Sequence, residues 1–175
     1  MKRIGVMLVL FTLISLSWSQ ETAEDKPVID KNSWGLGFGI PYGVLGGNVD
    51  VNIAPNLNVS FGLGTTILAG VGYNFGLKYF FSSVENTMRP RIMAFYGVNA
   101  MSEIGNDTDT YTGLSLGGGI QWMWGETKSN GLDIDVIFIA TTGYDIDELQ
   151  DRYGTRYIIE EYGKVKFSIG YRHSF

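Results

Sequence analysis

Apolar and polar residues alternate with a period of two along most of the chain after residue 33. Between residues 33 and 40, for example, Trp34, Leu36 and Phe38 alternate with glycines. Successive side chains on a strand point to opposite faces, so this alternation predicts strands. It recurs in eight segments separated by links rich in turn-forming residues, at about residues 33–40, 44–53, 57–64, 70–81, 89–100, 111–124, 131–140 and 164–175.

The chemistry of the two faces indicates the surroundings of these strands. One face carries bulky aliphatic and aromatic residues, and the other carries Gly, Asn, Ser and charged residues. The second face cannot form an oily core, but it can line a narrow polar lumen while the apolar face meets lipid. An open sheet edge in lipid would leave unpaired backbone groups that cost several kcal/mol each. We therefore expect residues 33–175 to form an eight-stranded antiparallel transmembrane β-barrel, and we favour it over a soluble lipocalin-like barrel.

The first 32 residues differ from the rest in composition. Lys2 and Arg3 precede an apolar run that ends near Leu16, and small residues follow before Gln20. The run is shorter than the roughly 20 residues that a membrane-spanning helix needs, so residues 1–19 are predicted to be a cleavable signal peptide. Residues 20–32 are polar and suit a periplasmic lead. Cleavage would remove two cations and change the formal net charge from −5 to −7.

The lengths of the links predict an orientation. Residues 54–56, 82–88 and 125–130 form short links, whereas residues 101–110 and 141–163 form longer polar ones. Outer-membrane barrels have short periplasmic turns and longer outer loops, so both termini are expected in the periplasm. Aromatic residues gather at membrane interfaces, and four would form a periplasmic girdle: Trp34, Tyr79, Trp124 and Phe175.

Several charged residues fall on the predicted lumen face. An eight-stranded barrel is only wide enough inside for side chains, and an unpaired buried charge is costly. We therefore expect these charges to pair and plug the lumen, with a gate in a narrow pore as the alternative. The predicted lumen cluster comprises Asp50, Lys78, Arg91, Asp133, Asp135, Lys166 and Arg172.

The last strand carries the most specific sequence signal. Gly170, Tyr171 and the terminal Phe175 lie on an alternating segment. In this respect the chain resembles small bacterial outer-membrane barrels of the outer membrane protein A transmembrane-domain and opacity-protein type. The resemblance covers about residues 33–175, and it implies that the last strand is an assembly signal read by the barrel assembly machinery. His173 departs from the family pattern, because an aromatic or aliphatic residue is usual there.

Two other groups of residues are candidates for chemical sites. Acidic residues in the 141–163 link could attract Ca²⁺ or a cationic partner, but the calcium-loop spacing fails because Gln150 replaces the required Gly. A solvated acidic loop is the favoured interpretation. The single histidine, His173, precedes Ser174, but neighbours on a strand point to opposite sides and cannot form a catalytic pair. We therefore predict no enzyme activity, no metal site and no cofactor.

The sequence favours an outer-membrane barrel with a structural or surface-interaction role and a largely plugged polar lumen. The alternatives are a narrow pore for small solutes or ions and a lipid-modifying outer-membrane enzyme. The expected partners are outer-membrane lipid, the assembly machinery during biogenesis and an extracellular ligand of unknown kind. An acidic chain is unsuited to nucleic acid, because phosphate contact requires a basic face.

Overall fold

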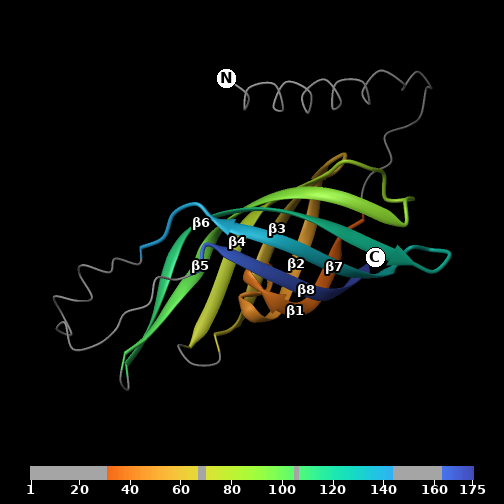
Figure 1. The fold of residues 1–175 in the computed structure, drawn as a ribbon. Coiled ribbons are helices and arrows are strands. Elements are labelled where there is room, and N and C mark those ends of the chain that lie inside the picture. The colour runs from red at the N-terminus through yellow and green to blue at the C-terminus, as the bar shows by residue number, and fades with distance from the viewer. Residues whose placement is uncertain (1–30, 67–69, 105–106, 144–162) are drawn as a thin grey trace, which may run out of the picture.

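Eight antiparallel strands form a closed barrel (Figure 1) in the computed structural model, which describes residues 31–66, 70–104, 107–143 and 163–175. The predicted all-β, eight-stranded antiparallel barrel is therefore confirmed. A 3-10 turn, η1 (Ile40–Tyr42), links the first two strands. The strands are β1 (Ser33–Gly39), β2 (Val44–Ala54), β3 (Leu57–Thr65), β4 (Val71–Phe80), β5 (Met88–Ile104), β6 (Asp107–Trp124), β7 (Asn130–Ile139) and β8 (Val165–Ser174).

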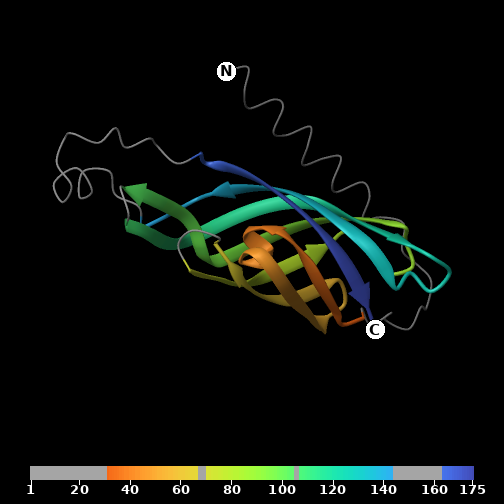
Figure 2. The same ribbon diagram turned by 90° about the horizontal axis from the view of Figure 1, so that it is seen from below.

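The barrel closes through pairing of the first and last strands. Ser33 lies opposite Ser174, and the pairing of β1 with β8 continues to Phe38 opposite Ile169. Every other strand pairs with its neighbours in sequence. We call the end that holds Ser33 and Ser174 the terminal end, and the opposite end, which holds η1, the end of β7 and the start of β8, the loop end (Figures 1 and 2).

The chain next to β1 is held at the terminal end by hydrogen bonds. The backbone N–H of Phe175 donates to the carbonyl of Asn32 at 2.9 Å, and that of Asn52 donates to Asn32 Oδ1 at 3.0 Å. The two ends of the barrel chain thus meet at one rim.

The described ranges contain no helix of the length and apolar character needed to cross a membrane.

Large apolar side chains cover the outside of the barrel, and polar ones are buried inside it. In β4, Tyr73, Phe75 and Leu77 are exposed, whereas Asn74 and Lys78 are fully buried. The same alternation is seen in β3 and β8. This distribution is the reverse of that in a soluble protein, where charged side chains are almost never fully buried unless they are paired.

The link predicted at residues 101–110 is wrong, because most of it is strand. β5 runs to Ile104 and β6 starts at Asp107, with Met101 opposite Thr110 and Ile104 opposite Asp107. Figure 1 shows this hairpin extending beyond the other strands at the loop end. Polarity suggested a loop, but two adjacent strands that already pair can continue their backbone hydrogen bonds whatever their side chains.

Near a bulge in β5, the strand alternation also assigns two side chains to the wrong face. The period of two in residues 89–100 places Val98 and Ala100 on the outer face with Tyr96, yet they are 1% and 5% exposed, while Tyr96 is 59% exposed. The pairing with β6 shifts register between Val98 and Ala100, so the extra residue Asn99 is accommodated there. A bulge changes the face to which the following side chains point, and a simple period of two cannot reveal it.

The link between β1 and β2, which contains η1, folds into the lumen of the barrel. The side chain of Tyr42 is completely buried, and Ile40 and Pro41 are also buried. The Asn74 side chain donates to the carbonyl of Ile40 at 2.6 Å, which holds the turn against the lumen side of β4. Gly43 and Val44 reverse the chain with φ values of 66° and 79°. A β-branched residue rarely adopts such a φ, so the tight return into β2 is strained at Val44.

Glycines on the surrounding strands provide the space for this turn. A methyl group built on Gly62 would overlap the carbonyl of Pro41, and one on Gly72 would overlap the carbonyl of Gly43. A methyl group on Gly170 would overlap the Tyr42 ring. The sequence predicted that these glycines line the lumen, and the structure shows that inward-folded backbone occupies the space they leave.

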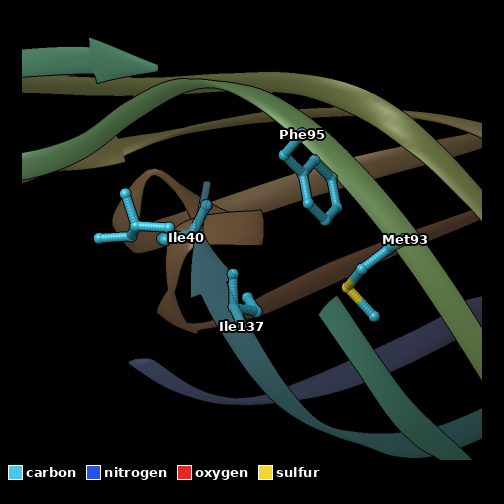
Figure 3. Packing of buried hydrophobic residues seen from close by; sticks show 5 residues of the cluster. Ile40, Met93, Phe95 and Ile137 are labelled. Atoms are coloured by element: carbon cyan, nitrogen blue, oxygen red, sulfur yellow. The ribbon is translucent and has the colours of Figure 1, made fainter. Parts of the chain in front are cut away.

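An apolar cluster fills part of the lumen near the loop end. It comprises Ile40, Met93, Phe95, Ile137 and Ile139, all at most 6% exposed (Figure 3). The expectation of a polar lumen therefore holds only in part here, because these apolar side chains lie beside buried polar ones such as Asn74 and Ser115. Side chains of η1 and of inward-facing positions on β5 and β7 pack together here, because the turn brings Ile40 within their reach.

Replacing Gly62 with Ala should destabilise the barrel by about 1–3 kcal/mol, because the added methyl group would displace η1 from a packed lumen. Gly118→Ala is the matched control, since its methyl group would meet only the Arg91 carbonyl at 3.6 Å. The measurement is the urea midpoint of refolded protein in detergent micelles. Equal midpoints for the two variants would show that η1 does not occupy the space beside Gly62.

Candidate functional site

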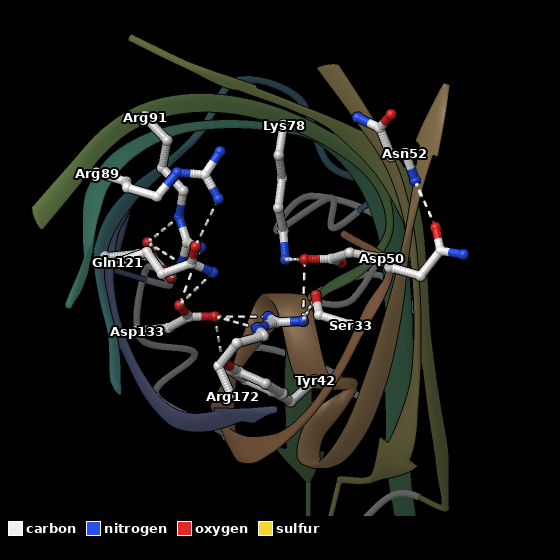
Figure 4. A network of polar contacts seen from close by, with 12 residues as sticks. Ser33, Tyr42, Asp50, Asn52, Lys78, Arg89, Arg91, Gln121, Asp133 and Arg172 are labelled. Atoms are coloured by element: carbon white, nitrogen blue, oxygen red, sulfur yellow. Dashed lines mark hydrogen bonds and ion pairs between the residues drawn. The ribbon is translucent and has the colours of Figure 1, made fainter. Parts of the chain in front are cut away.

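Six buried charges form a continuous network across the lumen in its terminal half (Figure 4). They come from β2, β4, β5, β7 and β8, and all have side chains that are 0% exposed. Cations and anions alternate along the network. Its members, in order of contact, are Lys78, Asp50, Arg172, Asp133, Arg91 and Asp135.

Asp50 lies between two cations at one end of the network. Lys78 Nζ donates to both Asp50 carboxylate oxygens, at 3.0 and 2.8 Å. Arg172 Nη1 lies 2.9 Å from Asp50 Oδ2. Arg172 sits on β8 opposite Gly35 of β1 and Gly131 of β7. Because neither neighbour has a side chain, the long Arg172 side chain can turn across the lumen toward Asp50.

Asp133 joins the two halves of the network. Arg172 Nε donates to Asp133 Oδ2 at 2.9 Å, and Arg172 Nη2 contacts the same oxygen. Arg91 Nη1 donates to Asp133 Oδ1 at 3.0 Å. The Tyr42 hydroxyl donates to Oδ2 at 3.0 Å, and the Gln121 amide lies 3.3 Å from Oδ1. One carboxylate therefore links β5, β6, β8 and the inward-folded turn.

Arg91 completes the network at its other end. Its Nε and Nη2 atoms donate to Asp135 Oδ1 at 3.1 and 2.8 Å, and Nη2 also lies 3.0 Å from Oδ2. Planar guanidinium groups suit such paired contacts with carboxylates. Beyond Arg91, Arg89 donates to Gln121 Oε1 at 3.1 Å and its guanidinium lies 4.1 Å from the centre of the Phe80 ring.

Three cations and three anions give the network no net charge. This balance matters because removing one partner of a buried ion pair leaves an uncompensated charge and costs about 3–5 kcal/mol. A guanidinium can contact two carboxylates at once, so the four inner members of the network each have two oppositely charged neighbours, whereas Lys78 and Asp135 at its ends have one each. Chemically, the network can cross-link strands and fill the lumen.

The seventh residue of the predicted cluster lies elsewhere. Lys166 is on the inward face of β8, nearer the loop end, and is half-buried. In the described part of the chain, its side chain has no ion pair and joins no part of the network. Lys166 precedes Arg172 on β8, and each residue advances a strand by about 3.3 Å. Lys166 therefore lies farther along the barrel axis than Asp133, toward the loop end.

Sequence reasoning missed two members of the site. Tyr42 and Gln121 both contact Asp133, and neither belongs to the cluster predicted from the sequence. The available signal for Tyr42 was an unusually short link, Pro41–Tyr42–Gly43, between glycine-rich segments. A link with an aromatic residue next to bare backbone can fold inward, but no periodic pattern predicts this.

The predicted girdle residues lie at the terminal end. Trp34 pairs with His173, and Trp124 pairs with Asn130, which itself lies opposite His173. Tyr79 is opposite Leu57, and Phe175 directly follows β8. Trp34 and Phe175 are exposed, as is Trp124. These aromatic residues therefore surround one rim of the barrel.

The residues of the predicted assembly signal occupy both faces of β8. Gly170 is buried against Tyr42, whereas Tyr171 points outward and its hydroxyl donates to Asn130 Oδ1. His173 Nδ1 lies 3.1 Å from the same Asn130 oxygen, and its ring centre lies 5.6 Å from that of Trp34. Ser174 is buried on the opposite face. The acidic residues 145–161 lie outside the described residues.

Replacing Arg172 with Ala should lower stability by about 3–5 kcal/mol, because Asp50 and Asp133 would both lose a buried partner. Lys128→Ala is the control for loss of one positive charge, since the Lys128 side chain donates an exposed hydrogen bond to Thr87 and takes no part in the network. Urea midpoints in detergent would measure both. An Arg172→Ala midpoint equal to that of Lys128→Ala would contradict a structural role for the network.

Removing Lys78 and Asp50 together should cost less than removing Lys78 alone. Lys78→Met leaves three anions facing two cations, whereas the Lys78→Met, Asp50→Asn double variant restores a balance of two and two. Apolar or neutral replacement of a whole buried pair is often nearly neutral. A double-mutant cycle of unfolding free energies would measure the coupling. Additive losses would show that Asp50 does not compensate Lys78.

Comparison with known proteins gives a limited result. No protein-family model matches the sequence, and no curated protein sequence matches it. Among solved structures, the chain is similar to the N-terminal β-barrel domain of Pseudomonas aeruginosa OprF, at 14% sequence identity and a TM-score of 0.49. The match covers 84% of this chain and 99% of that domain. The assignment as an eight-stranded antiparallel barrel, the architecture that the family resemblance implied, rests on the strand pairing itself.

Proposed function

We propose that the protein is a barrel of a bacterial outer membrane, with a structural or surface-interaction role and a lumen closed by its own side chains. The observation that carries this proposal is the belt of large apolar residues around the outside. Exposed examples include Leu36 at 57%, Phe75 at 56% and Phe138 at 54%. Soluble monomers rarely expose contiguous apolar patches larger than a few hundred Å², so lipid is the surrounding that suits this surface.

The buried charges support the same conclusion from the inside. Lys78, Arg91 and Arg172 are fully buried although the outer surface of the same strands is apolar. Closed strands satisfy the backbone in lipid, and a lumen-facing ion network satisfies the charged side chains. A barrel with an apolar outer surface and charged residues inside is stable in a bilayer and would aggregate in water.

The proposed orientation places both termini in the periplasm. Trp34, Trp124 and Phe175 surround the terminal end, where aromatic side chains would lie at the level of the lipid headgroups. The turns at this end are short, such as Pro55–Asn56 between β2 and β3. Short periplasmic turns are typical of outer-membrane barrels. The chain is accordingly proposed to enter the membrane from the periplasmic side.

The proposed closed lumen rests on three sets of contacts. The charge network crosses the terminal half, η1 lies between the strands, and the cluster of Ile40 with Phe95 and Ile137 packs nearer the loop end. Water and ions would have to displace paired charges and packed apolar groups to pass. We therefore propose a scaffold that presents its outer loops, and no enzyme: His173, on the outer face, contacts Asn130 and Trp34.

Refolding the chain without residues 1–19 into detergent and lipid vesicles tests this proposal. Folded outer-membrane barrels should migrate differently on gels before and after boiling, and planar bilayers containing the protein should show no discrete conductance steps. Absence of a migration shift would overturn the membrane-barrel assignment. Conductance steps in the unmodified protein would identify a pore instead. The Ile40→Gly, Tyr42→Gly variant, which empties part of the lumen, serves as the control in which steps are expected.

A further inference from the structure

The wall of the barrel is incomplete where β1 turns inward. Pairing between β1 and β8 stops at Phe38 opposite Ile169. The preceding residues of β8, from Val165 to Ser168, pair with β7 on one side. On the other side they do not pair with β1, although Gly39 lies against Ser168. The inward turn of the chain at Gly39 therefore leaves a notch in the wall near the loop end.

A pocket of about 190 Å³ lies at this notch. Some of its lining residues belong to the outer surface, such as Phe38 at 51% and Phe167 at 71% exposure, whereas Ile40, Val98 and Ala100 are buried. The pocket thus extends from the apolar outer surface toward the inside of the barrel. Its walls are mostly aliphatic and aromatic, which suits a hydrocarbon chain.

Two polar residues lie in this apolar pocket. Lys166 lines it and is half-buried, and its ammonium group has no ion-pair partner among the residues that the structure places. Asn99 also lines it and is 5% exposed. The Asn99 amide nitrogen donates to Ser115 and to the Thr141 carbonyl, but within the described ranges Asn99 Oδ1 has no hydrogen-bond partner. The pocket thus offers the Lys166 ammonium group to an anionic ligand. Asn99 Oδ1 is an acceptor and cannot bind a carboxylate, so the choice of ligand rests on Lys166 and on the apolar walls.

From these features we infer that the notch binds the carboxylate end of a long-chain fatty acid from the surrounding lipid. This inference rests on the proposed membrane location. A single lysine matches a single negative charge, and the pocket is smaller than the roughly 300–1,000 Å³ usual for drug-sized ligands. The carboxylate and the first carbons would lie beside Lys166, and the rest of the chain would pass out over Phe38 and Phe167 into the bilayer.

The geometry separates this binding from ordinary contact with bulk lipid. Lipid around the barrel touches only outward-facing side chains, whereas Val98 and Ala100 are 1% and 5% exposed and line the pocket from within. A reactive group near the fatty-acid carboxylate would therefore reach residues that bulk lipid cannot. The register shift comes directly before Ala100 and accounts for the inward position of that residue; Val98, which precedes the shift, is also buried.

Photolabelling of the refolded chain in phosphatidylcholine vesicles tests the inference. The probe is a long-chain fatty acid with a diazirine close to its carboxylate, and labelled residues are located by mass spectrometry of peptides. We expect labelling within residues 98–101, and about tenfold less in Lys166→Gln, because a charge-assisted hydrogen bond is lost. Lys164→Gln, with the same charge change just before β8 and outside the pocket lining, is expected to label like the unmodified chain.

Ala100→Phe should also abolish the label by filling the pocket, with the outward-facing Leu116→Phe as its matched control. Labelling confined to outward-facing residues, or equal labelling of the unmodified chain and Lys166→Gln, would overturn the inference. Gel migration before and after boiling is checked for each sample. A chain that fails to insert contradicts the proposed membrane function, whereas an inserted chain without label at residues 98–101 contradicts the fatty-acid site alone.

Discussion

The carboxylate of Asp133 is the contact on which the interior of this barrel depends. It accepts hydrogen bonds from Arg172, Arg91 and the Tyr42 hydroxyl, and so connects the last strand, the middle of the barrel wall and the inward-folded turn. A buried carboxylate must be compensated where it lies. Because Arg172 also reaches Asp50, which holds Lys78, the need to compensate each charge extends across the whole lumen.

An apolar exterior makes this arrangement necessary. When the outer face of every strand carries large apolar side chains, only the inner face remains for polar ones, and the narrow lumen admits little water to solvate them. The charges are therefore paired with one another, and the chain itself fills the remaining space with η1 and the cluster around Phe95. The barrel interior thus contains a charge network in its terminal half and an apolar cluster, beside buried polar residues such as Asn74, nearer the loop end.

The inward turn of β1 has effects on both sides of the wall. Inside, it places Tyr42 beside Asp133 and Ile40 beside the apolar cluster. At the wall, it ends the β1 strand early and leaves Lys166 and Phe167 next to a pocket instead of a paired strand. Glycines at 62, 72 and 170 make the turn possible because their backbone can approach it closely. One short link therefore determines how the lumen is filled and where the wall opens.

The strand alternation in the sequence predicted eight strands and the inward position of Asp50, Lys78 and Arg172, because a period of two assigns each side chain to a face. The closed antiparallel order followed from the cost of an open sheet edge in lipid. It could not predict the path of residues 40–43, the bulge between Val98 and Ala100, or the position of Lys166 away from the charge network. These features depend on space left by other strands, on register shifts and on height along the barrel axis. Only the tertiary structure decides them, since they arise from contacts between residues far apart in the chain.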